Sequence, residues 1–353
     1  MATVVENSGL LKGDKPAVSD SDIAASGPDA GERQAPVAAQ NRKAFPANPK
    51  LMKMVKSLAL PLVGILAFLS LWALLAPQVD TSLGSLPGPV EVGAQGIALY
   101  DEWSATQDDK AAFYEAQDAR NEAAVAAGNP VQNFEYSGSP TFLDQIWTSL
   151  KTVALGFFMA TIVAVPIGLV CGLSKNFNAA INPLVQIMKP VSPLAWLPIV
   201  TMVISATMTS PDPALPKSFV ISAIVVMLCS LWTTLINTAV GTASIDKDLL
   251  NVGRVLRLGW FAKLTRLVLP SALPYIFTGM RLSLGVGWMV LIAAEMLAQN
   301  PGLGKFVWDE FQNGSSQSLA RIMFAVIVIG LIGFMLDRMM MLLENFVSRN
   351  RTV

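Results

Sequence analysis

Six long stretches of apolar residues dominate the chain. A helix needs about 20 consecutive apolar residues to cross the hydrocarbon core of a bilayer, and six segments reach or approach that length: roughly 56–76, 149–173, 180–208, 217–240, 272–299 and 320–343. The third contains Pro183, Pro190, Pro193 and Pro198, so it is predicted to be a broken or kinked helix. The pattern predicts an all-α integral membrane protein with about six transmembrane helices.

The segments before and after the first apolar run are polar. Residues 1–50 are rich in Ala, Pro, Ser, Asp and Asn, which predicts a disordered tail. The first run starts too far along the chain for a signal peptide, so a retained helix is predicted over 51–76. Residues 98–127 are Ala- and Glu-rich, which predicts one or two helices within an insertion over 77–143. This insertion is either a solvated helical excursion or a docking surface for a partner outside the membrane.

Basic residues in the connections predict the orientation. Residues 77–148 carry many carboxylates and only two basic residues, whereas the connection between the fourth and fifth segments carries Lys247, Arg254, Arg257, Lys263 and Arg266. Placing this connection and the tail 346–353 in the cytoplasm gives six crossings in register. Both termini are then cytoplasmic, and the insertion lies outside.

Composition argues against an enzyme. The 353 residues are 53% hydrophobic and 14% charged, well below the charged fraction of about 25% in soluble chains. The chain has no histidine, and Cys171 and Cys229 both lie in apolar runs, so no histidine-dependent nucleophile, disulfide framework or usual zinc site is expected. We expect no catalytic residue and no bound metal. A net charge of zero gives no reason to expect a nucleic-acid partner.

The stretch from Ser244 to Pro274 is the most informative. Apolar residues alternate with charges at helical spacing on both sides of Gly259, which predicts two short amphipathic helices that meet at this glycine and end at Leu269-Pro270 and Leu273-Pro274. They are too short and too charged to span a bilayer. From the residues alone, they are a docking element, a helix pair resting on lipid, or a spacer.

This stretch resembles the cytoplasmic coupling loop of binding-protein-dependent ABC transporter permeases. The family has a Glu-Ala-Ala triplet, then a glycine, and a distal Ile-x-Leu-Pro. Here Leu267-Val268-Leu269-Pro270 occupies the distal end. The triplet position holds Asn251-Val252-Gly253, and the usual glycine position holds Arg257, with Gly259 two residues later. The first half of the motif therefore departs from the family.

The resemblance covers roughly residues 140–345 and is strongest with the nitrate/sulfonate/bicarbonate branch. The stretches 189–198 and 302–310 look most like nitrate permeases. The resemblance implies the transmembrane domain of a type I ABC importer, with its permease core over 144–345 and coupling helices at 247–269. The residues it assigns to ATPase coupling are Asp248, Leu249, Asn251, Val252, Gly253, Arg254, Arg257, Gly259 and Pro270.

The resemblance also implies a function and partners. The chain would be the permease subunit of an ATP-driven importer in the bacterial inner membrane, moving nitrate or nitrite. Alternatives within the family are sulfonates or taurine, bicarbonate and cyanate. Implied partners are ABC ATPase subunits, a periplasmic anion-binding protein and a second permease copy, as a homodimer in the lipid bilayer. The sequence has no Gly-x-x-x-x-Gly-Lys-Ser/Thr loop, so this chain would bind no cofactor, and ATP and Mg²⁺ would lie on the ATPase.

Polar residues inside apolar segments are candidates for the substrate path. These candidates are Lys189, Ser192, Trp196, Arg281 and Trp288. Alternatively, Lys189 extends to an interface, Arg281 extends to the cytoplasm or pairs with the coupling loop, and the tryptophans serve in packing. Glu295 lies fourteen residues after Arg281, or about 21 Å along a helix, so the two cannot pair. A structural position is expected for Glu295.

Two other protein classes were considered. A secondary transporter usually shows repeated halves and buried ionisable relays, and neither is evident in the sequence. A membrane enzyme is disfavoured by the missing histidine and by the lack of paired acids. Dependence of transport on a separate ATPase would separate the importer from both.

Overall fold

The computed structural model of the protein describes residues 49–81, 84–210, 214–315 and 317–349. The chain divides into two units, Met1–Leu60 and Pro61–Val353. Of the first unit, only the opening turns of α1 (Pro49–Leu75) are described. The tail expected over residues 1–50 therefore lies almost entirely outside the described residues, as do the last four residues of the chain.

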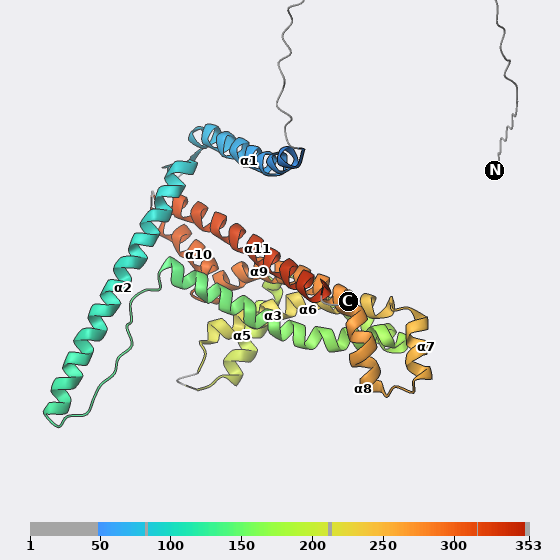
Figure 1. Cartoon of the computed structure of the whole chain (residues 1–353). Coiled ribbons are helices and arrows are strands. Elements are labelled where there is room, and N and C mark those ends of the chain that lie inside the picture. Colours follow the sequence, from blue (N-terminus) through green and yellow to red (C-terminus); the bar gives the residue numbers. More distant parts are fainter. Residues whose placement is uncertain (1–48, 82–83, 211–213, 316, 350–353) are drawn as a thin grey trace, which may run out of the picture. The chain divides into compact units, whose positions relative to one another are not determined.

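The second unit is built almost entirely of helices (Figure 1). After α1 come the short helix η1 (Ala76–Gln78) and a two-stranded antiparallel ribbon in which Asp80 pairs with Ser85, formed by β1 (Asp80–Thr81) and β2 (Gly84–Ser85). The remaining elements are α2 (Pro89–Ala126), α3 (Phe142–Leu173), α4 (Lys175–Met188), α5 (Pro193–Thr207), α6 (Lys217–Ala243), α7 (Lys247–Val255), α8 (Trp260–Lys263), the π-helical turn η2 (Leu264–Val268), α9 (Leu269–Ala298), α10 (Leu303–Asn313) and α11 (Ser318–Arg349).

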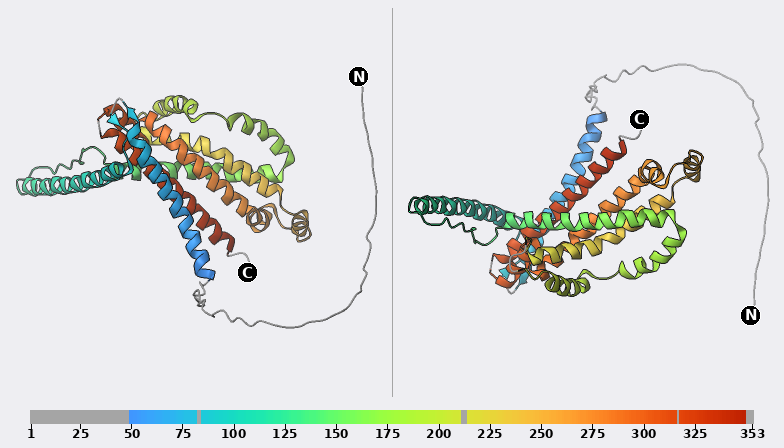
Figure 2. Two further views of the ribbon diagram at one scale, coloured as in Figure 1. Left: turned by 90° about the horizontal axis from the view of Figure 1, so that it is seen from above. Right: turned by 90° about the horizontal axis from the view of Figure 1, so that it is seen from below.

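The membrane-spanning pattern predicted from the sequence is confirmed. In the described part of the chain, five helical segments are long and apolar enough to cross a bilayer, and a sixth span results if α4 and α5 are counted together. These two helices are bent by 100° where they meet, at the prolines that predicted a broken helix, and Figure 2 shows the change of direction. The sequence did not predict α10, because its eleven residues mix apolar and charged positions.

Helices α3, α6 and α9 pack closely because small residues line their contacts. A Cβ on Gly156 of α3 would lie 2.6 Å from the carbonyl oxygen of Ala223, and one on Gly168 would lie 2.6 Å from Cβ of Thr238. On the other side of α6, a Cβ on Gly287 of α9 would lie 2.7 Å from the hydroxyl of Ser230. Small residues let helix backbones approach closely in lipid, where van der Waals packing drives association. These three helices therefore form the packed centre of the unit.

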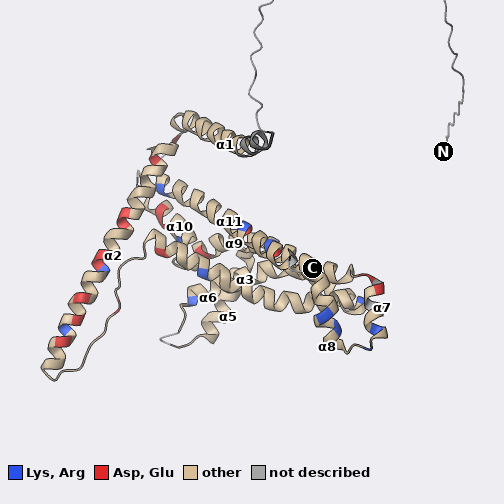
Figure 3. Ribbon diagram, viewed as in Figure 1, with Lys and Arg blue, Asp and Glu red and all other residues tan. Residues whose placement is uncertain are grey.

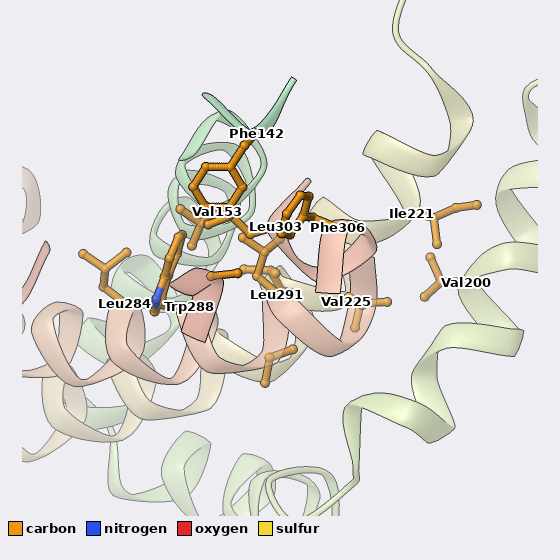
Figure 4. Close-up of a cluster of buried hydrophobic side chains, with 14 of the residues drawn as sticks. Phe142, Val153, Val200, Ile221, Val225, Leu284, Trp288, Leu291, Leu303 and Phe306 are labelled. Atoms are coloured by element: carbon orange, nitrogen blue, oxygen red, sulfur yellow. The ribbon is translucent and has the colours of Figure 1, made fainter. Parts of the chain in front are cut away.

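The largest group of buried apolar side chains lies toward the end of this centre where α3 begins. Phe142 of α3 packs edge-on against Phe306 of α10, with ring centroids 4.8 Å apart. Leu291 of α9 and Leu303 of α10 are fully buried, and Figure 4 shows these side chains together with Trp288. The short helix α10 is thus fixed against α3 and α9 by apolar packing.

The insertion between the first two spans is dominated by one helix, α2, of 38 residues. It begins nine residues earlier than the sequence pattern indicated, because Pro89 at its first turn and a bond from Gly88 N–H to the Glu91 carboxylate (3.1 Å) start the helix. The returning segment lies along its distal half: Phe134 N–H donates to Gln117 (2.7 Å). The prediction that the insertion is partly helical agrees with this arrangement.

Candidate functional site

The turn after α7 has the geometry of a Schellman motif. The N–H of Arg257 donates to the carbonyl of Arg254, and the N–H of Leu258 donates to that of Gly253, both at 3.0 Å. Arg257 has a φ of 48°, a left-handed conformation that favours glycine. Arg257 stands at the position where the resembled family has glycine, and this φ gives a physical reason for a glycine there. Gly259 has a φ of −61° and directly precedes α8, so it lies in the turn where the two helices meet, as predicted, although the left-handed residue of this turn is Arg257.

The two helices expose apolar side chains beside guanidinium groups. Val255 is 83% exposed and Phe261 71% exposed, and Leu256 and Trp260 between them are also exposed. Arg254 and Arg257 lie at the same turn, and basic residues mark α7 and α8 in Figure 3. Exposed apolar patches with charged margins are typical of protein interfaces. We call Arg254, Val255, Leu256, Arg257, Trp260 and Phe261 the turn surface.

Helix α8 continues into the transmembrane helix α9 without a break. Sequence analysis predicted that Leu269-Pro270 and Leu273-Pro274 end the second amphipathic helix, and this prediction is wrong. The π-helical turn η2 joins α8 to α9, and both prolines lie inside the continuous run. A π-helical turn changes the hydrogen-bond register locally, which lets a helix accommodate a proline that lacks an N–H. Trp260 and Phe261 of the turn surface therefore lie at the start of the helical run that continues into α9.

The base of this element is packed, not free. Gly253 of α7 is buried, and a Cβ there would lie 2.7 Å from the side chain of Leu267. Val268, Ala272 and Ile276 are buried against Leu169 of α3. The turn surface is consequently held in place by contacts with η2, α9 and the end of α3.

The break between α4 and α5 contains Lys189 and Ser192, and Trp196 lies in the first turn of α5. The Ser192 hydroxyl accepts a bond from Leu194 N–H (3.3 Å) and caps α5, while Lys189 is exposed and directly follows α4 as its C-cap. The indole N–H of Trp196 has no hydrogen-bond partner in the part of the chain that the structure describes. No hydrogen bond or ion pair between described residues joins this corner to Arg281 or Trp288.

Arg281 and Trp288 both connect α9 to α11. The guanidinium of Arg281 makes two bonds with Asp337, from Nε to Oδ1 (2.6 Å) and from Nη2 to Oδ2 (3.2 Å). The alternative in which Arg281 pairs with the coupling loop is therefore wrong. Trp288 is buried and donates its indole N–H to the carbonyl of Ile329 (3.0 Å). Its ring thus lies in the core, with its polar group already paired.

Glu295 is fully buried and joins three elements. Its carboxylate accepts bonds from the Ser149 hydroxyl of α3 (2.8 and 2.9 Å to the two oxygens) and from Gly304 N–H at the start of α10 (3.0 Å). The Ser149 hydroxyl in turn accepts from Leu303 N–H (2.9 Å). A side chain at Gly302 would overlap the carboxyl group. Glu295 therefore has the structural position expected from the sequence.

Helix α2 is attached through Arg321 of α11. Its guanidinium contacts Glu102 of α2, donates from Nε to the amide oxygen of Gln95 (3.4 Å), and pairs with Glu310 of α10 (3.3 Å). Glu310 is buried and also accepts a bond from the Ser318 hydroxyl (2.8 Å). This ion-pair cluster fixes the proximal part of α2 to the ends of α10 and α11.

Comparison with known proteins identifies the kind of membrane protein this is. Residues 164–349 match the model of the family described as binding-protein-dependent transport system inner membrane component. The chain belongs to this family. The bicarbonate transport system permease protein CmpB of Synechococcus elongatus is 33% identical over 308 residues, which is 85% of this chain and 93% of that protein.

Two further similarities extend the comparison. The nitrate import permease protein NrtB of the same organism is 36% identical over 204 residues, 58% of this chain and 69% of its own. A solved chain of the MetNI methionine ABC transporter covers 58% of this chain and 95% of itself, with 12% identity and a TM-score of 0.49. The family resemblance predicted from the sequence is confirmed, including the branch that contains nitrate and bicarbonate permeases. The protein is a multi-pass membrane permease.

Sequence analysis missed several polar residues of this permease that the structure places in contacts. Asp337 lies in an apolar segment and is an ionisable residue at a depth where such residues are rare, so it could have been found by that criterion. Ser149 could not, because it reaches Glu295 from 146 positions away and a serine in a transmembrane helix is common. Of the residues that sequence analysis assigned to coupling, six lie on α7, Arg257 and Gly259 lie in the turn before α8, and Pro270 lies in the first turn of α9.

Proposed function

We propose that this chain is the permease subunit of an ATP-driven importer for a small inorganic anion, with nitrate as the cargo. The observation that carries the proposal is the turn surface, which is apolar, flanked by arginines, and continuous through η2 with the transmembrane helix α9. A permease that uses the energy of a separate ATPase needs an element that both touches the ATPase and moves a transmembrane helix. Among the described residues, α8 is continuous with α9 through η2, and the turn surface at its start offers exposed apolar side chains for such a contact.

The proposed orientation places the turn surface in the cytoplasm of a bacterium, at the inner membrane. Basic residues gather on α7 and α8, while acidic residues mark α2, as Figure 3 shows. Cytoplasmic connections carry an excess of Lys and Arg. Both termini are then cytoplasmic, and α2 lies in the periplasm.

The partners in this proposal follow from the family and from what the chain lacks. Two ATPase subunits bind ATP and Mg²⁺ and dock at the turn surfaces. A periplasmic binding protein delivers the anion, and a second copy of this chain completes the passage as a homodimer. The absence of a phosphate-binding loop from the sequence supports the assignment of hydrolysis to a partner.

The cargo assignment rests on the relatives and on anion chemistry. The relative CmpB is named as a bicarbonate permease and the relative NrtB as a nitrate permease. Bicarbonate and nitrate are both planar oxyanions with one negative charge. Nitrate is proposed first because segments 189–198 and 302–310 look most like nitrate permeases. Lys189, Ser192, Trp196 and Arg281 are the proposed path residues, whereas the buried Trp288 supports the path by packing.

The test is uptake by the assembled transporter. The permease is reconstituted in vesicles with its ATPase and its binding protein, and labelled nitrate and labelled bicarbonate are followed with and without ATP. We expect ATP-dependent accumulation of nitrate. ATP-independent uptake, or uptake by the permease alone, would contradict the importer assignment, and preferential accumulation of bicarbonate would overturn the cargo.

A paired substitution tests the coupling assignment. Val255→Asp places a charge in the exposed turn surface and should weaken ATPase association by about tenfold or more, because an unpaired charge is poorly tolerated in an apolar interface. The matched control is Val125→Asp, at an exposed valine near the end of α2, which should leave association unchanged. Equal co-purification of the ATPase with both variants would remove the turn surface from the coupling role.

A further inference from the structure

The ion pair between Arg281 and Asp337 lies deep within two membrane-spanning helices. Arg281 is twelve residues from Leu269, where α9 begins, and Asp337 is twelve residues from Arg349, where α11 ends. At 1.5 Å per residue, both lie about 18 Å from those ends, and more than about 25 Å from the opposite ends. The two bonds to Asp337 hold the guanidinium at this depth, so it does not extend to the membrane surface.

The two charged side chains are partly exposed although they lie far from the helix ends, which would be unfavourable if the surrounding medium were lipid. Arg281 retains 35% of its side-chain accessibility and Asp337 37%. Ionisable groups inside the membrane face the interior of a bundle or a water-filled cavity, because hydrocarbon solvates neither charge. The face of α9 and α11 that carries this pair therefore adjoins water or another polar surface.

Polar and small residues lie one turn from the pair on the same two helices, beside the exposed apolar Leu282 and Met289. Thr278, one turn before Arg281, donates its hydroxyl to the carbonyl of Pro274 (2.9 Å), and this hydroxyl lies 3.4 Å from the Glu344 carboxylate of α11. Gly285, one turn after it, is exposed, and no atom lies within 4 Å of the position of a Cβ there. Near its middle, α3 exposes only apolar side chains such as Phe158 (62%) and Ile162 (54%), as expected for a surface against lipid. We call Thr278, Arg281, Gly285, Asp337 and Glu344 the polar face.

The chemistry of the pair matches that of the proposed cargo. Arg281 holds Asp337 through two adjacent N–H donors, the arrangement that guanidinium groups use for planar oxyanions. An edge of nitrate or bicarbonate presents two oxygens in the same way as a carboxylate. Asp337 therefore occupies the place on Arg281 that such an anion would take.

We propose that the polar face lines the aqueous passage, and that Arg281 contacts the anion there after it displaces Asp337. This inference rests on the proposed import of a small anion. Competition from Asp337 keeps binding weak, which transport requires because the anion must also leave. When no anion is present, Asp337 keeps the guanidinium paired and prevents it from remaining as an isolated charge.

The first experiment measures water access and does not depend on the cargo. In the full complex in native membranes, Cys171 and Cys229 are replaced by alanine, and Gly285→Cys is compared with Phe158→Cys, which lies near the middle of α3. The probe is sulfonatoethyl methanethiosulfonate, an anionic, water-soluble thiol reagent. We expect modification of the Gly285→Cys variant alone, slowed by excess nitrate. An unreactive Gly285→Cys variant, or equal reaction of both, would overturn the proposal.

The second experiment separates contact with the anion from a structural ion pair. Arg281→Gln with Asp337→Asn removes both charges and leaves neither unpaired. If the pair serves only structure, the double variant should transport like the wild type, and the proposal fails. If Arg281 contacts the anion, uptake should fall about ten- to hundredfold, while assembly and basal ATP hydrolysis are retained. Arg281→Lys should raise the KM for the anion more than it lowers the maximal rate.

The proposed function and the assignment of the polar face can be refuted separately. If the wild-type complex accumulates neither nitrate nor bicarbonate, the proposed function fails, but thiol access still reports whether the polar face is wet. If uptake occurs and the Gly285→Cys variant is inaccessible, only the assignment of the polar face fails.

Discussion

Removing the carboxylate of Glu295 should destabilise the permease strongly, although this residue lies far from the turn surface. Glu295→Ala leaves the buried Gly304 N–H without its acceptor and the Ser149 hydroxyl without the group to which it donates. A buried polar group without a partner costs about 1–3 kcal/mol. The lost side chain also leaves a cavity between α3, α9 and α10, although it removes the cost of burying a charge.

These effects combine to a loss of about 3–5 kcal/mol in the free energy of unfolding, because two buried groups each lose a partner at about 1–3 kcal/mol and a cavity is left. Glu295→Gln keeps the shape and one acceptor oxygen, but it points an amide N–H₂ at groups that already donate. Its loss should be smaller, about 1–3 kcal/mol. The order Ala, then Gln, then wild type follows from the direction of the hydrogen bonds.

The assay is thermal unfolding in detergent, followed with a fluorescent maleimide that reacts with Cys171. This cysteine is 3% exposed in the folded chain, so it reacts when the helices separate. Glu295→Ala should lower the apparent Tm by roughly 5–15 °C. The control is Glu115→Gln, an exposed glutamate of α2, which should leave the Tm unchanged. If Glu295→Ala has the same apparent Tm as Glu115→Gln, the network contributes nothing to stability.

Two other substitutions test local features of the fold. Arg257→Gly should stabilise the turn after α7 by about 1 kcal/mol, because it removes the strain of a side chain at positive φ. Amide hydrogen exchange at Leu258 should then be slower than in the wild type, and faster exchange would contradict the assigned strain. Arg321→Gln should release α2 from α10 and α11, seen as faster cleavage by trypsin after Arg120. Unchanged cleavage would show that apolar contacts alone, such as Gly96 on Phe324, hold α2.

Much of the membrane topology was predictable because it depends on local composition. Apolar runs located the spans, and the prolines of the third run located the bend between α4 and α5. The amphipathic pattern located α7 and α8. These features are visible in one sequence because each is decided by residues close together along the chain.

The features that escaped prediction depend on partners distant in sequence or on local hydrogen-bond register. Pro270 and Pro274 suggested a helix end, but η2 accommodates Pro270 by a change of register that no residue pattern announces. The early start of α2 at Pro89 was missed because Pro and Gly suggested a loop. The Glu295 network and the pairing of Arg281 with Asp337 join residues from separate helices, and only packing brings them together.

The unbroken run from Trp260 to Ala298 has a consequence for timing. A force applied at Trp260 reaches the opposite side of the bilayer, over about 58 Å, without passing through a loop. At that far side, Glu295 fastens the run to α3 and α10. The cytoplasmic end and the periplasmic end of this run would then move at the same time, as the helix tilts. A measurable delay between the two movements in time-resolved fluorescence would require a second mobile element.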